Sequence, residues 1–374
     1  MFIPLTKPYF NNKEVKAVQK VLKSGWVVQG PKVKEFEEKF AKFIGAKYAI
    51  ATTSCTTALH LSLVSLGIGK GDEVIAPAFT FVATANAIEY TGAKPVFADI
   101  ESNTFNISPE LVEGLITPRT KAIIPVHLFG LAAEITPILK IAQKYKLKII
   151  EDAACGLGSF YKNKHAGTFG DCGCFSLHPR KAITAGEGGI ITTNSKKLAD
   201  RLVSLRDHGA SMSDLARHQK GLPMLPEYNQ LGFNYRMTDI QGAILCEQFK
   251  KLQFILKERR EKAEIYNKAL KNSKFFEIPF VPQNYFHSYQ SYVLLVKDGF
   301  SRDKIANKLI EKGITVRQGT QSVPHLGFYK KKYGYTNKDY PNSLKAERQT
   351  LTIPLFATMT KKEQDYIIKK LKGL

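Results

Sequence analysis

Three side chains of different chemistry lie near the middle of the chain: the carboxylate of Asp152, the hydroxyl of Ser176 and the amine of Lys181. An apolar run over residues 147–150 ends two residues before Asp152, and a second run, 172–177, contains Ser176. Both runs are typical of buried strands. Because ligands of open α/β sheets bind beyond the carboxyl ends of the strands, we expect the three groups to meet at one edge of a sheet.

Together these groups match the needs of pyridoxal 5'-phosphate. An amine can form a Schiff base with its aldehyde, a carboxylate can hold the proton on its ring nitrogen, and a hydroxyl can bind its phosphate. Each residue also has an ordinary explanation, because a lone lysine is usually solvated and Asp152 could simply cap a helix. The joint pattern, and no single residue, favours the cofactor.

The motifs around these residues resemble the DegT–StrS family of sugar-nucleotide aminotransferases. The family signature combines Glu-Asp-Ala-Ala, Phe-Ser-Phe-His-x-x-Lys and Gly-Glu-Gly-Gly, which correspond here to residues 151–154, 175–181 (with Leu177 for the second Phe) and 186–189. The resemblance implies an aspartate aminotransferase-like fold and bound pyridoxal phosphate. It makes Lys181 the catalytic amine and Asp152 the partner of the cofactor's ring nitrogen.

The same resemblance implies further cofactor contacts. It places Cys55 and Thr56 at a helix N-terminus that binds the phosphate, Phe81 flat on the cofactor ring, and the small Ala154 under that ring. It also places His127 near the cofactor, although a lone histidine at a strand end is more often structural. The family usually has glycine where Cys55 stands and often has glutamine where Cys155 stands. Because cysteine is a poor hydrogen-bond donor, we expect Cys155 to make a weaker contact to the ring hydroxyl than glutamine would.

Residues expected near the substrate come from separate parts of the chain. The resemblance places Trp26, His178, Arg317 and His325 beside the nucleotide sugar, although Trp26 and His178 could equally be structural. The Arg-Gln-Gly-Thr sequence beginning at Arg317 departs from the commoner His-Tyr pattern of the family and leaves the sugar open. Asn234, in the family's Gly-x-Asn-Tyr-Arg-Met loop, is expected to reach the cofactor phosphate of a partner subunit in a homodimer with shared active sites.

The elements that position these residues alternate between strand and helix patterns from residue 48 to residue 150. This alternation predicts a large α/β domain with a mostly parallel sheet flanked by helices. We expect that cofactor-binding domain to span 1–250 and a smaller α+β domain to span 251–374, with the N-terminal segment able to pack on the small domain. A long helix is expected over 240–270, a strand over 313–318 and a loop over 211–227. The last helix is expected to open with a capping box formed by Thr360 and Glu363.

Composition excludes several classes of protein. The 374 residues are 44% hydrophobic, which is typical of a globular protein, and no apolar run approaches the length of a membrane span. The first residues lack a signal-peptide pattern, so we expect a cytoplasmic protein. The five cysteines are few and scattered, with Cys172 and Cys174 expected as small buried residues, and predict neither a disulfide nor a metal site.

The formal net charge of +22 raises the possibility of nucleic-acid binding. The lysines are spread along the chain without a basic tail, which favours a solvated surface that attracts anionic small molecules. The expected reaction is therefore amino transfer from glutamate or glutamine to a keto-deoxy-sugar nucleotide, giving an amino-dideoxy sugar nucleotide for polysaccharide biosynthesis. Two alternatives stay open: a dehydratase on the same fold, which has histidine in place of the lysine, and a non-catalytic regulatory or nucleic-acid-binding protein.

Overall fold

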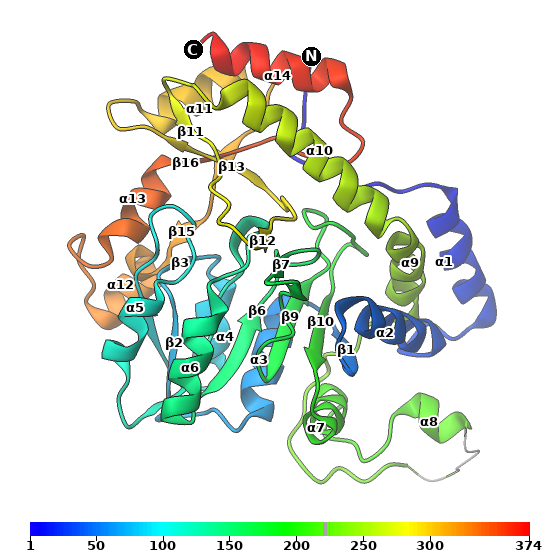
Figure 1. Cartoon of the computed structure of the whole chain (residues 1–374). Helices are drawn as coiled ribbons and strands as arrows, with labels where there is room; N and C mark the ends of the chain where they lie inside the picture. Colours follow the sequence, from blue (N-terminus) through cyan, green and yellow to red (C-terminus); the bar gives the residue numbers. More distant parts are fainter. Residues whose placement is uncertain (220–222, 224) are drawn as a thin grey trace.

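A seven-stranded sheet forms the centre of the computed structural model, which describes residues 1–219, 223 and 225–374. Across the sheet (Figure 1) the strands run in the order β1 (Tyr48–Thr52), β10 (Gly189–Thr193), β9 (Cys172–Ser176), β6 (Lys148–Asp152), β5 (Thr120–Ile123), β2 (Glu73–Pro77) and β4 (Lys94–Ala98). β10 is antiparallel to its neighbours β1 and β9, and the other neighbouring pairs are parallel. The predicted mostly parallel sheet is therefore confirmed.

Helices cover both faces of this sheet. α3 (Cys55–Ser65), α4 (Ala83–Tyr90) and α7 (Lys196–Arg206) pack on one face, where Cys172 and Cys174 are buried as expected. α2 (Pro31–Ile44) and α6 (Ile135–Tyr145) pack on the other face. α3 is apolar on all sides and is buried accordingly, whereas α2 is amphipathic and ends at Gly45, whose φ of +81° suits glycine.

A smaller α+β unit contains a four-stranded sheet of β11 (Phe276–Glu277), β13 (Tyr292–Val296), β16 (Thr350–Ile353) and β14 (Arg317–Gln318). Helices α10 (Leu252–Leu270), α11 (Arg302–Glu311) and α14 (Lys361–Lys372) lie with it, above the large sheet in Figure 1. Thr360 and Glu363 form the expected capping box at the start of α14. Ile3 bridges Ile314 and is buried in the core of this unit.

The structure differs from the expected elements in three places. The helix expected over 240–270 is two helices, α9 (Asp239–Lys250) and α10, separated at Lys251, whose amine contacts Glu14. The expected loop over 211–227 contains α8 (Asp214–Gln219), and its residues 220–222 and 224 lie outside the described residues. The strand expected over 313–318 is only the two residues of β14, preceded by the bridge at Ile314.

Short elements complete the chain. They are α1 (Asn12–Ser24), β3 (Phe79–Thr80), α5 (Pro109–Val112), η1 (Glu113–Leu115), η2 (Leu128–Gly130), β7 (Phe160–Tyr161), β8 (Lys164–His165), β12 (Tyr285–Phe286), β15 (Gln321–Ser322), η3 (Val323–His325), α12 (Gly327–Tyr333) and α13 (Pro341–Gln349). In the described part of the chain, no helix combines the length and apolar character needed to cross a lipid bilayer.

Candidate active site

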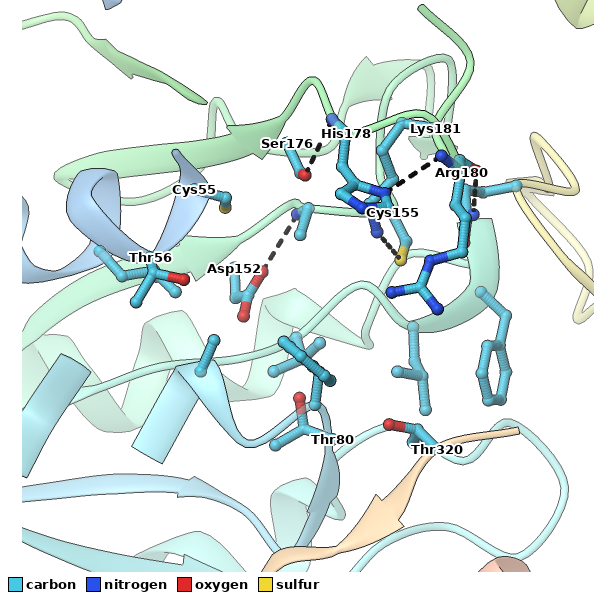
Figure 2. A pocket seen from close by; sticks show the side chains of 18 of the residues that line it. Cys55, Thr56, Thr80, Asp152, Cys155, Ser176, His178, Arg180, Lys181 and Thr320 are labelled. Carbon is cyan, nitrogen blue, oxygen red and sulfur yellow. Dashed lines mark hydrogen bonds between the residues drawn. The ribbon is translucent and has the colours of Figure 1, made fainter. Parts of the chain in front are cut away.

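A cavity of about 360 Å³ lies beyond the carboxyl ends of β6 and β9. Asp152, Ser176 and Lys181 all line it, so the edge of the sheet brings together the three groups that the sequence pattern singled out (Figure 2). Parallel strands β6 and β9 are direct neighbours in the sheet, and their equivalent ends therefore place these side chains close together. The other predicted residues that line the cavity are Cys55, Thr56, Phe81, Ala154, Cys155, His178 and Arg317.

Asp152 ends β6 and is 5% exposed. Its Oδ2 accepts a hydrogen bond from the Thr84 hydroxyl at 2.8 Å, and its Oδ1 accepts one from the Ala154 amide at 3.1 Å. Burial raises the pKa of the Asp152 carboxyl, while the two hydrogen bonds and the charge of Lys181 act in the opposite direction. The carboxylate keeps acceptor capacity on the side of the cavity, because its oxygens can accept about four hydrogen bonds in total.

Glu151, the preceding residue, points to the opposite face of β6 and is completely buried. Its oxygens accept hydrogen bonds from the amides of Gly167, Phe169 and Gly170 at 2.6–2.8 Å and from His127 Nε2 at 2.8 Å. His127, which was expected near the cofactor, is therefore held behind the strand and does not line the cavity.

Lys181 lies in the loop between β9 and β10. Its backbone amide donates to the His178 carbonyl at 2.8 Å, and its side-chain Nζ donates to Cys155 Sγ at 3.1 Å. This weak sulfur contact leaves the amine free to react with a carbonyl group, since a thiol is a poor acceptor. The His178 ring also lines the cavity and lies 3.9 Å from the Glu187 carboxylate, measured from Nε2 to Oε1.

The N-terminus of α3 forms one wall of the cavity. Ser54 caps the helix, and its hydroxyl accepts a hydrogen bond from the Thr57 amide at 3.1 Å. The amides of Cys55 and Thr56 have no hydrogen-bond partner within the described residues. A Cβ built on Gly189 would lie 2.2 Å from the Ser54 carbonyl oxygen and 2.7 Å from the Cys55 amide nitrogen. Glycine at 189 thus lets strand and helix approach closely, and the free amides form a site for an anion such as phosphate.

These observations test whether the residues fit pyridoxal phosphate. The free amides of α3 and the Ser176 hydroxyl suit its phosphate. Among the described residues, this hydroxyl accepts a single long hydrogen bond of 3.5 Å, from the His178 amide. Asp152 suits its ring nitrogen and Lys181 its aldehyde. Phe81, 55% exposed although aromatic, offers a flat apolar surface on the cavity wall. The donor set therefore fits the cofactor.

Three predicted residues lie outside the cavity of this chain. Trp26 Nε1 donates to the Gln29 carbonyl at 3.2 Å, and its ring meets the edge of His218. Both nitrogens of His325 are occupied within the small unit, by the Ser322 hydroxyl at 2.7 Å and the Thr336 carbonyl at 3.0 Å. These contacts hold Trp26 and His325 within the chain, and their expected place beside the substrate stays a prediction. Asn234 is exposed, and its expected role in a partner subunit stays a prediction.

The sequence pattern did not single out several residues that the fold brings to the site. Thr84 lies in α4 and contacts Asp152 across 68 positions of the chain, so only the folded arrangement reveals it. Gln290 comes from the segment before β13 and lines the cavity. Arg180 could have been found, because it lies within the motif that ends at Lys181.

Solved structures with the same fold as this chain define its class of protein. Helicobacter pylori PseC, described as an aminotransferase involved in the biosynthesis of pseudoaminic acid, is 28% identical with a TM-score of 0.91 and covers 99% of this chain and 98% of its own. The Streptococcus pneumoniae protein Spr1654, described as a candidate sugar aminotransferase in its PLP form, is 28% identical with a TM-score of 0.92 and covers 100% and 98%. The present fold is that of an aminotransferase of this class.

The chain belongs to the DegT/DnrJ/EryC1/StrS aminotransferase family, whose model matches residues 8–372. It is also 38% identical to the spore coat polysaccharide biosynthesis protein SpsC of Bacillus subtilis, over 100% of this chain and 97% of that protein. The family consists of pyridoxal-phosphate-dependent sugar aminotransferases, and the resemblance drawn from the motifs is confirmed. The protein is accordingly an enzyme, and the expectation of an aminotransferase holds.

Proposed function

We propose that this enzyme transfers the amino group of glutamate or glutamine to a keto-deoxy-sugar nucleotide and so produces an amino-dideoxy sugar nucleotide. The observation that carries the proposal is the meeting of Lys181, Asp152 and the N-terminus of α3 around one cavity. The similarity to SpsC and PseC, whose descriptions name polysaccharide and pseudoaminic acid biosynthesis, supports a sugar as the acceptor. The presence of lysine at 181 favours amino transfer over the dehydratase alternative.

When bound, pyridoxal phosphate supplies an electron sink for the α-carbon of the amino-acid donor. Four parts of this chain would hold it: Lys181 at the aldehyde, Asp152 at the ring nitrogen, the amides at the start of α3 with Ser176 at the phosphate, and Phe81 on a ring face. Asp152 must remain ionised in this role. Hydrogen bonds from Thr84 and the Ala154 amide stabilise the ionised carboxylate, because they lower its pKa and so oppose the effect of burial.

Lys181 is also the group placed to move protons. Its ε-amine lines the cavity and, whenever it is not joined to the cofactor, could take the α-proton of the donor as a general base. The surrounding walls, which include Val126, Leu128 and Phe129, limit the access of water to this proton. The same amine can return a proton to the sugar carbon when the acceptor reacts.

The proposal includes a homodimer in which Asn234 of one subunit completes the phosphate site of the other. The exposure of Asn234 and its position outside the cavity of its own chain support this arrangement. Analytical ultracentrifugation of wild-type protein and cofactor titration of Asn234→Ala would test it. We expect a dimer, and a several-fold weaker affinity for pyridoxal phosphate in the variant, because one charge-assisted hydrogen bond is lost.

The central experiment replaces Lys181 with alanine. Borohydride reduction followed by peptide mass mapping should find the cofactor joined to the peptide containing Lys181 in wild type and to no peptide in Lys181→Ala. Release of 2-oxoglutarate from L-glutamate should fall below detection in the variant. Lys197→Ala, which removes an exposed lysine of α7, serves as the matched control and should retain both properties.

A Lys181→Ala protein that still carries a covalently bound cofactor and transaminates would refute the role of Lys181. With wild-type protein, a panel of keto-sugar nucleotides analysed by mass spectrometry would then identify the acceptor. For the correct sugar, we expect a product in which an amino group has replaced the keto oxygen.

A further inference from the structure

Two guanidinium groups without an anionic partner face the cavity. Arg180 comes from the loop after β9 in the large unit, and Arg317 comes from β14 in the small unit. Within the described part of the chain, neither side chain forms an ion pair or a hydrogen bond, and the Nε atom of Arg317 is buried. Burial lowers the pKa of Arg317, and the neighbouring charge of Arg180 lowers it further. Holding two such cations together costs free energy unless an anion joins them.

Two other buried arginines, Arg206 and Arg259, differ from Arg317 because their guanidinium groups form hydrogen bonds within the chain. Arg206 and Arg259 also bury an Nε atom without an acceptor. However, Arg206 Nη1 binds the Glu37 carboxylate and the Ala51 carbonyl at 2.5 and 2.8 Å. Arg259 Nη1 lies within 3.5 Å of three backbone carbonyl oxygens. These contacts give both residues a structural role that Arg317 lacks, which indicates that Arg317 serves a ligand.

Both arginines line the cavity that contains the reacting amine. Arg180 immediately precedes Lys181, and its backbone carbonyl accepts a hydrogen bond from Gln290 Nε2 at 2.8 Å, which ties the loop to the small unit. In Figure 2 its side chain extends back towards Cys155, whose Sγ lies 3.1 Å from Lys181 Nζ. Arg317 lines the same cavity as Cys155 and Lys181. An anion bound between the arginines would therefore share a cavity with the Lys181 amine.

The position of the two arginines distinguishes between the two anionic substrates, the amino-acid donor and the sugar nucleotide. In an amino acid, the α-carboxylate is attached to the same carbon as the reacting nitrogen. In a sugar nucleotide, the sugar ring separates the diphosphate from the reacting carbon. An anion site in the cavity of Lys181, with Arg180 adjacent to Lys181 in the chain, thus fits the α-carboxylate better than the diphosphate.

We propose that Arg180 and Arg317 together bind the α-carboxylate of the amino-acid donor. This inference rests on the proposed function, since it takes the donor to be an α-amino acid, and it holds for glutamate and glutamine alike. The planar guanidinium of Arg317 can bind a carboxylate through two parallel hydrogen bonds, which a lysine cannot do. The site spans both units of the fold, so donor binding links β14 to the loop that carries Lys181.

The donor half-reaction tests this assignment without any sugar nucleotide. Protein loaded with pyridoxal phosphate is mixed with L-glutamate, or with its α-amide, which lacks the α-carboxylate, and the absorbance change of the cofactor is followed. The variants are Arg180→Gln, Arg317→Gln and Arg317→Lys. Arg201→Gln, which removes an exposed positive charge on α7, is the matched control.

In each glutamine variant, the second-order rate constant for L-glutamate should fall about ten- to hundred-fold, the effect of losing hydrogen bonds to a charged group. The α-amide, already slow with wild type, should not be slowed further, so the preference for L-glutamate over the amide should collapse. A general structural defect would slow both compounds equally. Arg317→Lys should recover part of the preference, and Arg201→Gln should behave like wild type.

Calorimetric titrations with glutarate and with uridine diphosphate provide a readout independent of chemistry. Glutarate binding should weaken in Arg317→Gln while uridine diphosphate binding should change less than two-fold. The assignment is overturned if the variants keep the wild-type preference for L-glutamate over its α-amide, or if they lose uridine diphosphate binding instead. Failure of wild-type protein to react with either L-glutamate or L-glutamine would overturn the proposed function itself, and this is measured before any variant.

Discussion

Glu151 and Asp152 are adjacent carboxylates on one strand, and both are buried, yet they face different surroundings. Glu151 meets three backbone amides and His127 on one face of β6. On the other face, the Asp152 carboxylate accepts hydrogen bonds from two of the described residues, through the Thr84 hydroxyl and the Ala154 amide, and it lines the cavity. The four donors around Glu151 use the acceptor capacity of a carboxylate fully, whereas those around Asp152 use about half of it.

The difference shows that burial of a carboxylate does not by itself identify a reactive group. A buried carboxylate with all of its lone pairs occupied organises the backbone that donates to it, here the turn from Gly167 to Gly170. A buried carboxylate with remaining acceptor capacity and access to a cavity can bind a ligand. Glu151 is therefore expected to contribute to stability and Asp152 to catalysis, and substitution of each should reveal one effect without the other.

Asp152→Asn should produce the largest effect. Removing the negative charge opposite the cofactor's ring nitrogen is expected to lower kcat by about a hundred- to a thousand-fold, the usual range for one electrostatic contact at a reacting centre. The measurement is single-turnover kinetics with L-glutamate, and Asp365→Asn, an exposed position of α14, is the control. Turnover within a few-fold of wild type would show that Asp152 is not the partner of the ring nitrogen.

The folding stability of Asp152→Asn is expected not to fall, in contrast to its activity. Because burial raises the pKa of Asp152 in the folded state, its contribution to stability is present at low pH and is lost as the pH rises through that raised pKa. In cofactor-free protein at neutral pH, the ionised carboxylate is thus unfavourable, and Asp152→Asn should be at least as stable as wild type. A clearly lower urea midpoint for the variant would remove the contrast with Glu151.

Glu151→Gln should reverse this pattern. The new amide NH₂ would face backbone N–H donors that all require an acceptor, and His127 cannot compensate, because its Nδ1 already accepts from the Ala133 amide at 3.0 Å. Leaving buried donors unsatisfied should cost about 2 kcal/mol or more of unfolding free energy. Urea denaturation is the test, with Glu277→Gln on the exposed side of β11 as the control. An unchanged stability together with lost activity would place Glu151 in the catalytic machinery.

Much of the fold followed from local patterns. The strand and helix alternation predicted the sheet, since short apolar runs and amphipathic helices such as α2 are strongly periodic. The break at Lys251 was not predictable, because the apolar pattern continues through it and the lysine is held by a tertiary contact to Glu14. Similarly, the polar stretch containing α8 has no long apolar period that would indicate a helix.

The site was predictable only as far as its motif extends. Strand alternation places Glu151 and Asp152 on opposite faces, but which face holds the cavity depends on α4, which supplies Thr84. The anion site of Arg180 and Arg317 joins residues 137 positions apart, on two different units of the fold, and no local pattern connects them. The motif pattern also did not show that Trp26 and His325, which the resemblance places near the substrate, make their contacts outside the cavity of this chain.

The smallest predicted effect concerns Thr84, the residue that keeps Asp152 ionised in a buried position. Thr84→Val retains the shape of the side chain and removes the hydroxyl that donates to Oδ2, so the pKa of Asp152 should rise further. The acidic limb of the pH profile of kcat/KM should then move to higher pH by about one unit, since a hydrogen bond to a charged group is worth about that much. Thr84→Ser, which keeps the hydroxyl, should restore the wild-type profile. A profile that does not move, or that moves to lower pH, would mean that Thr84 does not stabilise the ionised form and that the two faces of β6 differ less than their hydrogen bonds indicate.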